Sequence, residues 1–464
     1  MPADRQPVVV VLCVGLTARL VPMAPRIAEL ARRGWQCSLI EVVPAVTCTA
    51  QATLLTGTTP DKHGIVANGW LYRDTMEVRF WQQSNRLLQA EPLYVTAKQR
   101  AQRRGQTFRC AKLFWWFNQG ADVEYSVTPK PYYGADGSKV FGITGRPEHL
   151  PQELESALGR FPFETFWGPS AGYPCTDWIA RCAVWILERY RPDLTLVYLP
   201  HLDYDLLRYG PSRADLPRLL RELEHAFARI QDASNQLGAR LVVVSEYGHL
   251  DVRRLIYINR ILREHGYLRV RPGPFGEQLE TFESVAFGVC DHQICHLYVR
   301  EPEQVAEVAD LVAKVPGVAR VLVGEARAEL SLDHPRSGDL VLLAEPDSWF
   351  AYPFWLDDKH APDYAPTVDI HRKPGFDPCE LFFDPQLWWP KGRLLWRLLQ
   401  KKMGFRVLFD VIPLDASLVG GSHGVAASDP LDRPVLISDG PCPGTSLAMT
   451  AFRDWLLNLL GLPD

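Results

Sequence analysis

The stretch from Pro44 to Trp70, PAVTCTAQATLLTGTTPDKHGIVANGW, gathers residue types that could do chemistry. Thr47 and Thr49 follow an apolar, β-branched run and precede a short helical pattern. A helix that starts directly after a strand leaves backbone N–H groups unpaired, and an anion or a nucleophilic hydroxyl can lie there. An ordinary crossover, in which the threonines only cap the helix, has the same local pattern. The surrounding segments must therefore decide between these two interpretations.

Polar residues also follow two other predicted strands. The strand 194–199 runs into Pro200-His201-Leu202-Asp203-Tyr204-Asp205, and the strand 240–245 runs into Glu246-Tyr247-Gly248-His249. Near the end of the chain, glycines flank His423 in Gly420-Gly421-Ser422-His423-Gly424. Open α/β sheets place their active sites at the carboxyl ends of neighbouring parallel strands. These clusters are therefore candidates for one shared site.

The elements that must position these residues alternate between strand and helix. The near-continuous apolar run Val8–Cys13 predicts a strand buried on both faces, and an amphipathic helix that ends at Gly34 follows it. The strand 37–43, a helix over 94–104 and a strand over 108–113 continue the alternation. This βαβ rhythm predicts an α/β fold with a central, mostly parallel sheet flanked by helices.

Residues 267–360 have a different pattern, with one helix among several strands. We expect a smaller α+β insert there, between a first part of the core (1–266) and a return to the core (361–464) that ends in a helix over 446–460. At 464 residues the chain is long for a single core, so more than one lobe is expected.

An aromatic, Pro- and Gly-rich region interrupts the alternation after Leu113. Aromatic side chains in such loops line ligand pockets about as often as they fill the space beneath a long loop. Trp115, Trp116 and Tyr132 are the candidates for substrate binding in this region.

Composition excludes several classes of protein. The formal net charge of −4 favours neither nucleic acid nor an anionic membrane as a partner, and no apolar run is long enough to span a bilayer. The ten cysteines contain no C-x-x-C pair, which disfavours a zinc ribbon and is typical of reduced thiols. We therefore expect a soluble cytoplasmic protein that binds neither nucleic acid nor membranes; the oligomeric state is left open.

The segment Pro44–Trp70 resembles the nucleophile segment of type I phosphodiesterases/nucleotide pyrophosphatases in the alkaline phosphatase superfamily. That segment runs roughly P-[ST]-x-T-F-P-N-H…T-G-x-x-P-x-x-H-G-I-x-x-N. The opening strand with Gly15, the Pro200–Pro211 segment, Glu246-Tyr247-Gly248 and the His423 loop follow in the family's order. The resemblance therefore covers nearly the whole chain and implies an alkaline-phosphatase-like fold.

The resemblance also implies a chemistry. In the family, a threonine held by one of two zinc ions attacks phosphorus, and the second metal activates the water that releases the product. Carried over by position, Thr47 is the nucleophile, and Asn68 is the residue that steadies a phosphoryl oxygen. Asp203, Glu246 and His423 fall at metal-ligand positions.

Three positions depart from the family pattern. Val14, Leu207 and Tyr247 stand where the family has an aspartate and two histidines. These departures leave three alternatives. Nearby groups could substitute for the lost ligands, or a single ion held by Asp203, Glu246 and His423 could suffice, including a harder cation such as Mg²⁺ or Mn²⁺. In the third alternative the metal site is absent. The nearby groups are His201, Asp205, His249 and Asp251.

Two other histidines have competing interpretations. Asp291-His292 imitates a family Asp-His pair, but its flanking strands favour a hydrogen-bond network within the insert. His371 could reach a phosphate, although a solvated charged turn is the commoner reason for such a sequence.

The resemblance implies a metal-dependent hydrolase of phosphodiester or pyrophosphate bonds, acting on a small phosphorylated or nucleotide-like substrate. The alternative is a catalytically impaired phospho-ligand-binding or scaffold protein on the same fold. One or two divalent ions, zinc by family, would be the cofactor.

Overall fold

The computed structural model describes residues 5–135, 139–403, 405 and 407–464. Its largest sheet has nine strands in the order β23-β2-β22-β11-β1-β10-β5-β6-β9. The five adjacent strands from β11 to β6 run parallel, whereas β22 and β9 pair antiparallel with their neighbours. Their bounds are β11 Arg240–Val244, β1 Val8–Cys13, β10 Leu194–Leu199, β5 Cys110–Leu113, β6 Tyr125–Pro129, β9 Ile143–Arg146, β22 Val435–Ser438, β2 Trp35–Ile40 and β23 Ser446–Ala448.

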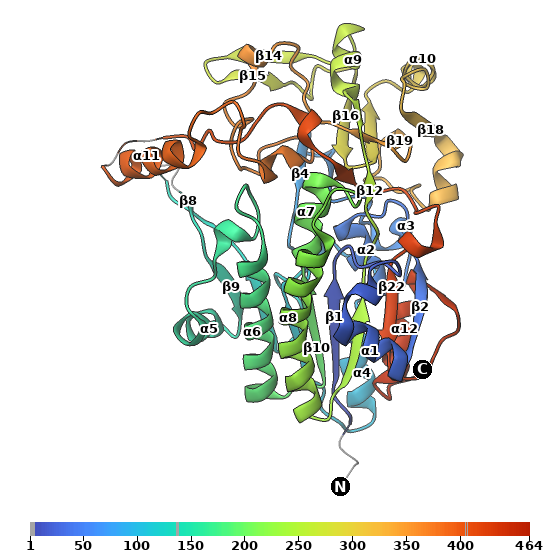
Figure 1. Ribbon diagram of the computed structural model, residues 1–464. Coiled ribbons are helices and arrows are strands. Elements are labelled where there is room, and N and C mark those ends of the chain that lie inside the picture. The colour runs from blue at the N-terminus through green and yellow to red at the C-terminus, as the bar shows by residue number, and fades with distance from the viewer. Residues whose placement is uncertain (1–4, 136–138, 404, 406) are drawn as a thin grey trace.

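Helices cover both faces of this sheet (Figure 1). On one face α6 (Tyr173–Tyr190) packs on α8 (Leu216–Gln236) and on β10, while α1 (Pro25–Arg33) packs on α8 and β22. On the other face α2 (Thr47–Thr56), α4 (Leu93–Arg103) and α12 (Phe452–Leu459) contact one another. Every residue of β1 is buried, because helices cover the central strands from both sides. The expected α/β fold class is confirmed.

A second, antiparallel sheet lies at the opposite end of the molecule from the N-terminus (Figure 1). It consists of β16 (Ala286–Asp291), β17 (Ile294–Val299), β19 (Leu340–Ala344) and β18 (Val318–Val323), with α10 (Val305–Val312) packed against β18. All of these elements fall within the proposed insert, residues 267–360.

The chain from 361 onward returns to the nine-stranded sheet as β22 and β23. The helix expected over 446–460 is partly wrong, because Ser446–Ala448 pairs with β2 as a strand and α12 begins only at Phe452. Two helices follow patterns that the sequence did not reveal, α7 (His201–Tyr209) and α11 (Pro390–Lys402). Within the described ranges, no helix combines the length and apolarity that a membrane crossing requires.

Candidate active site

Thr47 is the first residue of α2, and the corner that leads into it is fixed by the C-terminal His423 loop. Val46 is extended and ends the connection from β2, so the helix starts at Thr47. The Ala45 N–H donates to the Gly424 carbonyl at 2.9 Å, and His423 Nδ1 lies 2.8 Å from the Ala45 carbonyl. All ten residues of α2 are buried. The helix start is therefore held from both sides, at the carboxyl end of the central sheet.

The Thr47 hydroxyl has a tyrosine as its partner. Thr47 Oγ1 lies 2.9 Å from Tyr247 Oη, which itself donates to Asp203 Oδ1 at 3.4 Å. Because the phenol uses its proton on Asp203, the Thr47 hydroxyl donates to Tyr247. Burial raises the pKa of Tyr247 well above its ordinary value, and the charge of Asp203 adds to that effect. Tyr247 is therefore a neutral phenol that orients the Thr47 hydroxyl.

Asp203, His249 and His423 form a compact group beside Thr47. One ligand atom from each lies within 4.8 Å of the other two. His249 Nε2 is 2.9 Å from Asp203 Oδ1, and His423 Nε2 is 4.0 Å from the same oxygen. His423 faces the Ala45 carbonyl with Nδ1, which places the proton on Nδ1 and leaves the Nε2 lone pair facing Asp203.

The charge state of His423 also suits a ligand. Burial holds its pKa well below the ordinary value, and the neighbouring His292 and His249 lower it further. A neutral imidazole offers a lone pair to a cation. The Tyr247 ring stacks on His423 with 3.7 Å between ring centroids, which fixes the plane of the imidazole.

Glu246 lies outside this group. Its Oε1 accepts a hydrogen bond from Gln51 Nε2 at 2.6 Å, while Gln51 Oε1 accepts from the Trp116 N–H at 2.8 Å. Full burial raises the pKa of Glu246 well above its ordinary value, so the carboxyl is held in its neutral form. Val14, also fully buried, adds only apolar surface nearby.

Of the four groups proposed as substitutes for lost ligands, the structure brings only His249 into the cluster. His201 Nε2 lies 3.0 Å from Glu222. Asp205 pairs with Arg208 at 2.7 Å and with Arg218, and Asp251 bonds the hydroxyl and the N–H of Ser212. These three belong to the packing of α7 and its neighbours.

Asn68 is tied into the site by a residue of the second sheet. Its Oδ1 accepts from the Cys48 N–H at 2.9 Å, and its own N–H and Nδ2 donate to Asp291 at 2.7 and 3.1 Å. His292 Nδ1 lies 2.7 Å from Asp291, and its ring packs 3.9 Å from that of His423. The network expected within the insert therefore reaches the candidate site itself. The Asp-His dipeptide was the only sequence signal for this contact.

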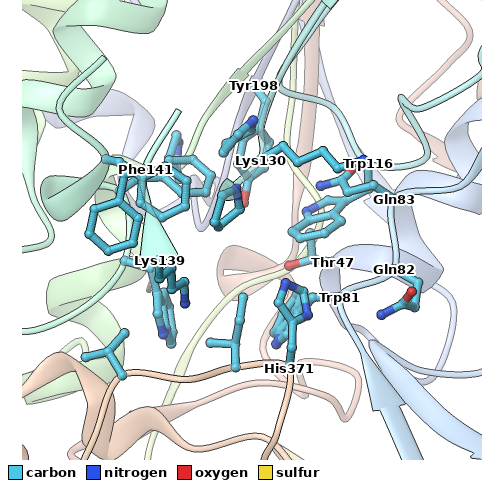
Figure 2. Close-up of a pocket in the computed structure, with 18 of the residues that line it drawn as sticks. Thr47, Trp81, Gln82, Gln83, Trp116, Lys130, Lys139, Phe141, Tyr198 and His371 are labelled. Carbon is cyan, nitrogen blue, oxygen red and sulfur yellow. The ribbon is translucent and has the colours of Figure 1, made fainter. Parts of the chain in front are cut away.

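Thr47 and Asp203 line a pocket of about 440 Å³. Figure 2 shows Thr47 among the side chains of its wall. Aromatic rings make up much of its wall, and Lys130, Lys139 and His371 add polar groups. The aromatic wall consists of Trp81, Trp116, Tyr133, Phe141, Phe163, Phe166, Trp167, Tyr198 and Tyr204.

The structure places the three predicted substrate-binding aromatics differently. Trp116 lines the pocket, Trp115 is fully buried in the hydrophobic core, and Tyr132 is 61% exposed while its neighbour Tyr133 lines the pocket. His371 also lies in the pocket wall, where burial and the charge of Lys139 lower its pKa. The pocket thus joins a hydroxyl, an Asp/His group and a largely aromatic wall.

The sequence profile of the type I phosphodiesterase / nucleotide pyrophosphatase family matches residues 8–377, which contain Thr47, Asn68, Asp203 and Glu246. The chain belongs to this family. The match ends before the His423 loop, so that loop is placed by the structure alone. Among curated proteins, none matches the chain.

Solved structures share the fold over nearly the full length. Phosphonoacetate hydrolase from Sinorhizobium meliloti 1021, in complex with phosphonoformate, is 16% identical, with a TM-score of 0.62 over 98% of this chain and 96% of its own. Murine ectonucleotide pyrophosphatase / phosphodiesterase 5 is 15% identical, with a TM-score of 0.59 over 98% and 95%. The alkaline-phosphatase-like fold expected from the sequence is confirmed.

Proposed function

We propose that this protein hydrolyses a phosphodiester or pyrophosphate bond, with Thr47 as the nucleophile and one divalent ion held by Asp203, His249 and His423. The observation that carries the proposal is the position of Thr47 on the pocket floor, 2.9 Å from a tyrosine that also bonds Asp203. Membership of the family supports the class of reaction.

The donor set fits one ion. Two imidazoles and one carboxylate, with ligand atoms within 4.8 Å of one another, are a ligand set that zinc uses in catalytic sites, where a fourth position stays open. The His423 Nε2 lone pair needs no change of protonation to accept this role, and His249 offers Nε2, which lies 2.9 Å from Asp203 Oδ1. When bound, the ion would supply positive charge where phosphoryl and leaving oxygens become anionic.

The residues do not fit a second ion. Val14 has no ligand atom, Tyr247 is a neutral phenol engaged with Thr47 and Asp203, and Glu246 is a neutral carboxyl bonded to Gln51. We therefore derive no step from a second metal.

The side chains of the chain have separate tasks in this scheme. Tyr247 accepts the Thr47 proton in a hydrogen bond, which aims the other lone pairs of Thr47 Oγ1 away from the phenol. The Thr47 oxygen forms a bond to phosphorus as the bond to the leaving oxygen breaks, the Thr47 proton passes along the Tyr247 phenol to the Asp203 carboxylate, and the leaving oxygen takes a proton from solvent. Water then breaks the bond between Thr47 and phosphorus, its hydroxyl going to phosphorus and its proton to the Thr47 oxygen. Asn68 Nδ2 uses one hydrogen on Asp291 and keeps a second for a phosphoryl oxygen.

The pocket wall suggests the kind of substrate. Its aromatic rings favour a phosphoester with an apolar or aromatic substituent, and Lys130 and Lys139 offer positive charge to an anionic part. A murine relative of the same fold was solved with AMP, which supports a small phosphorylated molecule as the ligand.

Replacement of the nucleophile tests this function. We expect Thr47→Ala to lower the zinc-supported turnover of a nitrophenyl phosphodiester by about a thousandfold or more, because no other hydroxyl is held by Tyr247. Thr47→Ser keeps a nucleophilic oxygen and should retain measurable turnover. Thr49→Ala, at a fully buried position two residues on, is the matched control and should behave as the wild type.

Two results would contradict the proposal. Full turnover in Thr47→Ala would remove Thr47 from the reaction. Tight binding of the phosphodiester without turnover in the zinc-loaded wild type would instead favour the alternative, a phospho-ligand-binding protein.

A further inference from the structure

The helix α11 stands apart from both sheets and projects from the body of the molecule (Figure 1). We call residues 385–403, which contain it, the α11 segment. Its base is closed by backbone hydrogen bonds from the Asp384 N–H to the Val411 carbonyl at 2.8 Å and from the Ile412 N–H to the Pro366 carbonyl at 3.2 Å. The segment is therefore an excursion on a fixed neck, and neither the core nor the candidate active site uses it.

The α11 segment exposes an unusual amount of apolar surface. It holds six of the eighteen exposed large apolar side chains of the described residues. Trp388 is 98% exposed, Trp389 64% and Trp396 54%, and the other eleven tryptophans of the chain are buried or half-buried. Exposed tryptophans gathered in one place mark a binding surface, whereas single exposed apolar residues are normal.

Four apolar residues of the α11 segment share one face. Leu395, Trp396, Leu399 and Met403 are all exposed and lie at helical spacings of one, four and eight residues. On another side, Arg393 and Arg397 both bond the Asp410 carboxylate, so this side faces the returning chain. The apolar face is therefore turned to solvent while the helix is anchored from its other side.

The charge of the segment opposes that of the whole chain. Residues 385–403 contain five Lys and Arg and no Asp or Glu, although the chain has a formal net charge of −4. The basic residues are Lys391, Arg393, Arg397, Lys401 and Lys402. Arg393 and Arg397 are paired with Asp410, and the segment still carries a net positive charge by sequence. Exposed tryptophans on a helix rich in Lys and Arg are typical of helices that lie in a membrane interface.

We propose that the α11 segment docks on an anionic membrane surface, with its exposed tryptophans and leucines among the acyl chains and its net positive charge attracted to the lipid phosphates. A second copy of the chain fits the same face poorly, because symmetric pairing would bring two segments of net positive charge together. The expectation of no membrane partner rested on the net charge of the whole chain and on the absence of a long apolar run, and the vesicle experiment below decides between it and this proposal.

The position of the neck relates this surface to the pocket. Pro366, which anchors the neck, precedes the pocket-lining residues Val368, Ile370 and His371. The hairpin of β7 (Tyr132–Tyr133) and β8 (Lys139–Val140) lines another part of the pocket and exposes Tyr132 and Val140. Docking through α11 would therefore hold the aromatic pocket close to the lipid surface.

Vesicle flotation of the full-length protein tests the proposal. We expect binding to phosphatidylcholine vesicles that contain about 30% phosphatidylglycerol, and binding weaker by about tenfold or more to phosphatidylcholine alone or in high salt. Trp388→Ser/Trp389→Ser/Trp396→Ser should lose about tenfold or more of the binding. Lys402→Gln should lose about fivefold, because an exposed cation near such a surface contributes substantially to binding.

The matched control is Phe275→Ser/Phe282→Ser, which removes two aromatic rings that are 63% and 61% exposed elsewhere on the surface. This control should bind vesicles as the wild type does, and circular dichroism should show every variant folded. Equal recovery of wild type and tryptophan variant with the vesicles would overturn the proposal. A wild-type dimer that the tryptophan variant loses, without vesicle binding, would overturn it in favour of self-association.

Discussion

At the scale of single residues, Tyr247 connects Thr47, the proposed nucleophile, to the group formed by Asp203 and His423. It lies 2.9 Å from Thr47 Oγ1, donates to Asp203 and stacks on His423. In the family pattern this position is a histidine ligand, so the tyrosine exchanges a metal contact for a hydrogen bond to the nucleophile. His249, two residues later, supplies an imidazole to the cluster. In the proposed function, these two changes leave a site for one ion instead of two.

A variant of Glu246 distinguishes the proposed site, in which this carboxyl is not a ligand, from a site in which it binds the metal. Since the buried carboxyl is already neutral and bonded to Gln51, Glu246→Gln keeps its shape and its acceptor oxygen. We expect the variant to keep its zinc content, and its free energy of unfolding should change by less than about 1 kcal/mol. Metal analysis and urea unfolding measure these quantities, and loss of bound zinc in Glu246→Gln would show that this carboxyl is a ligand.

At the scale of elements, the site depends on three connections that lie at the carboxyl ends of the strands of the large sheet. Thr47 starts α2 after β2, Asp203 lies in the first turn of α7 after β10, and His249 follows β11. The parallel strands β1, β10 and β11 bring these ends together because their registers match residue by residue.

Lys112 in β5 is a fully buried amine, and burial lowers its pKa to about 7. Between about pH 7 and its ordinary pKa, the unfolded chain binds a proton that the folded chain does not, so stability rises with pH over that window. Below about pH 7 both states are protonated, and the full penalty for burying the charge remains. Lys112→Met removes this penalty, while Asn85 Nδ2 still donates to the Phe117 carbonyl that Lys112 contacts.

We therefore expect Lys112→Met to be more stable than the wild type near pH 6, by about 2 kcal/mol or more, and the advantage should shrink toward pH 9.5. Urea unfolding at both pH values measures the difference. Lys62→Met, at an exposed side chain, is the control and should show no such dependence. An unchanged difference between Lys112→Met and wild type at the two pH values would contradict the explanation.

The strands that cross the core could be predicted from the sequence with the greatest accuracy. The bounds of β1 and β10 match the predicted ones, because continuous burial on both faces leaves an unbroken apolar run. Ser446–Ala448 was assigned to a helix because edge pairing with β2 leaves no apolar alternation in three residues. The sequence did not predict the α11 helix, because this helix buries no face in the core. Its apolar residues are exposed, so no core packing sets their spacing.

The candidate site could be predicted only at positions that match the ordered motifs of the family. Thr47 and Asp203 line the predicted pocket, but His249 was one of four equivalent possibilities, since sequence spacing does not show which loop side chain turns inward. Asp291 and His292 belong to the second sheet and the turn after β16, and Asp291 is 223 residues away from Asn68 in the sequence. A local sequence pattern cannot predict a contact between residues so far apart.

At the scale of the whole molecule, the second sheet is joined to the core through the candidate site. Asp291 accepts hydrogen bonds from the Asn68 backbone and side chain and lies 2.7 Å from His292, and it is fully buried. We expect Asp291→Ala to lower the free energy of unfolding by about 3 kcal/mol and to reduce turnover, because Asn68 loses its anchor. Asp291→Asn keeps one acceptor oxygen and should lose less, and a loss below about 1 kcal/mol in the alanine variant would contradict this coupling.

The stoichiometry of bound zinc tests the central claim most directly. After saturation with zinc and desalting, mass spectrometry of the metal content should find one ion per chain in the wild type and a large loss in His249→Ala, since His249 completes the cluster with Asp203 and His423. Two tightly bound ions per chain, or full retention of zinc in His249→Ala, would contradict a hydrolase built on this single metal site.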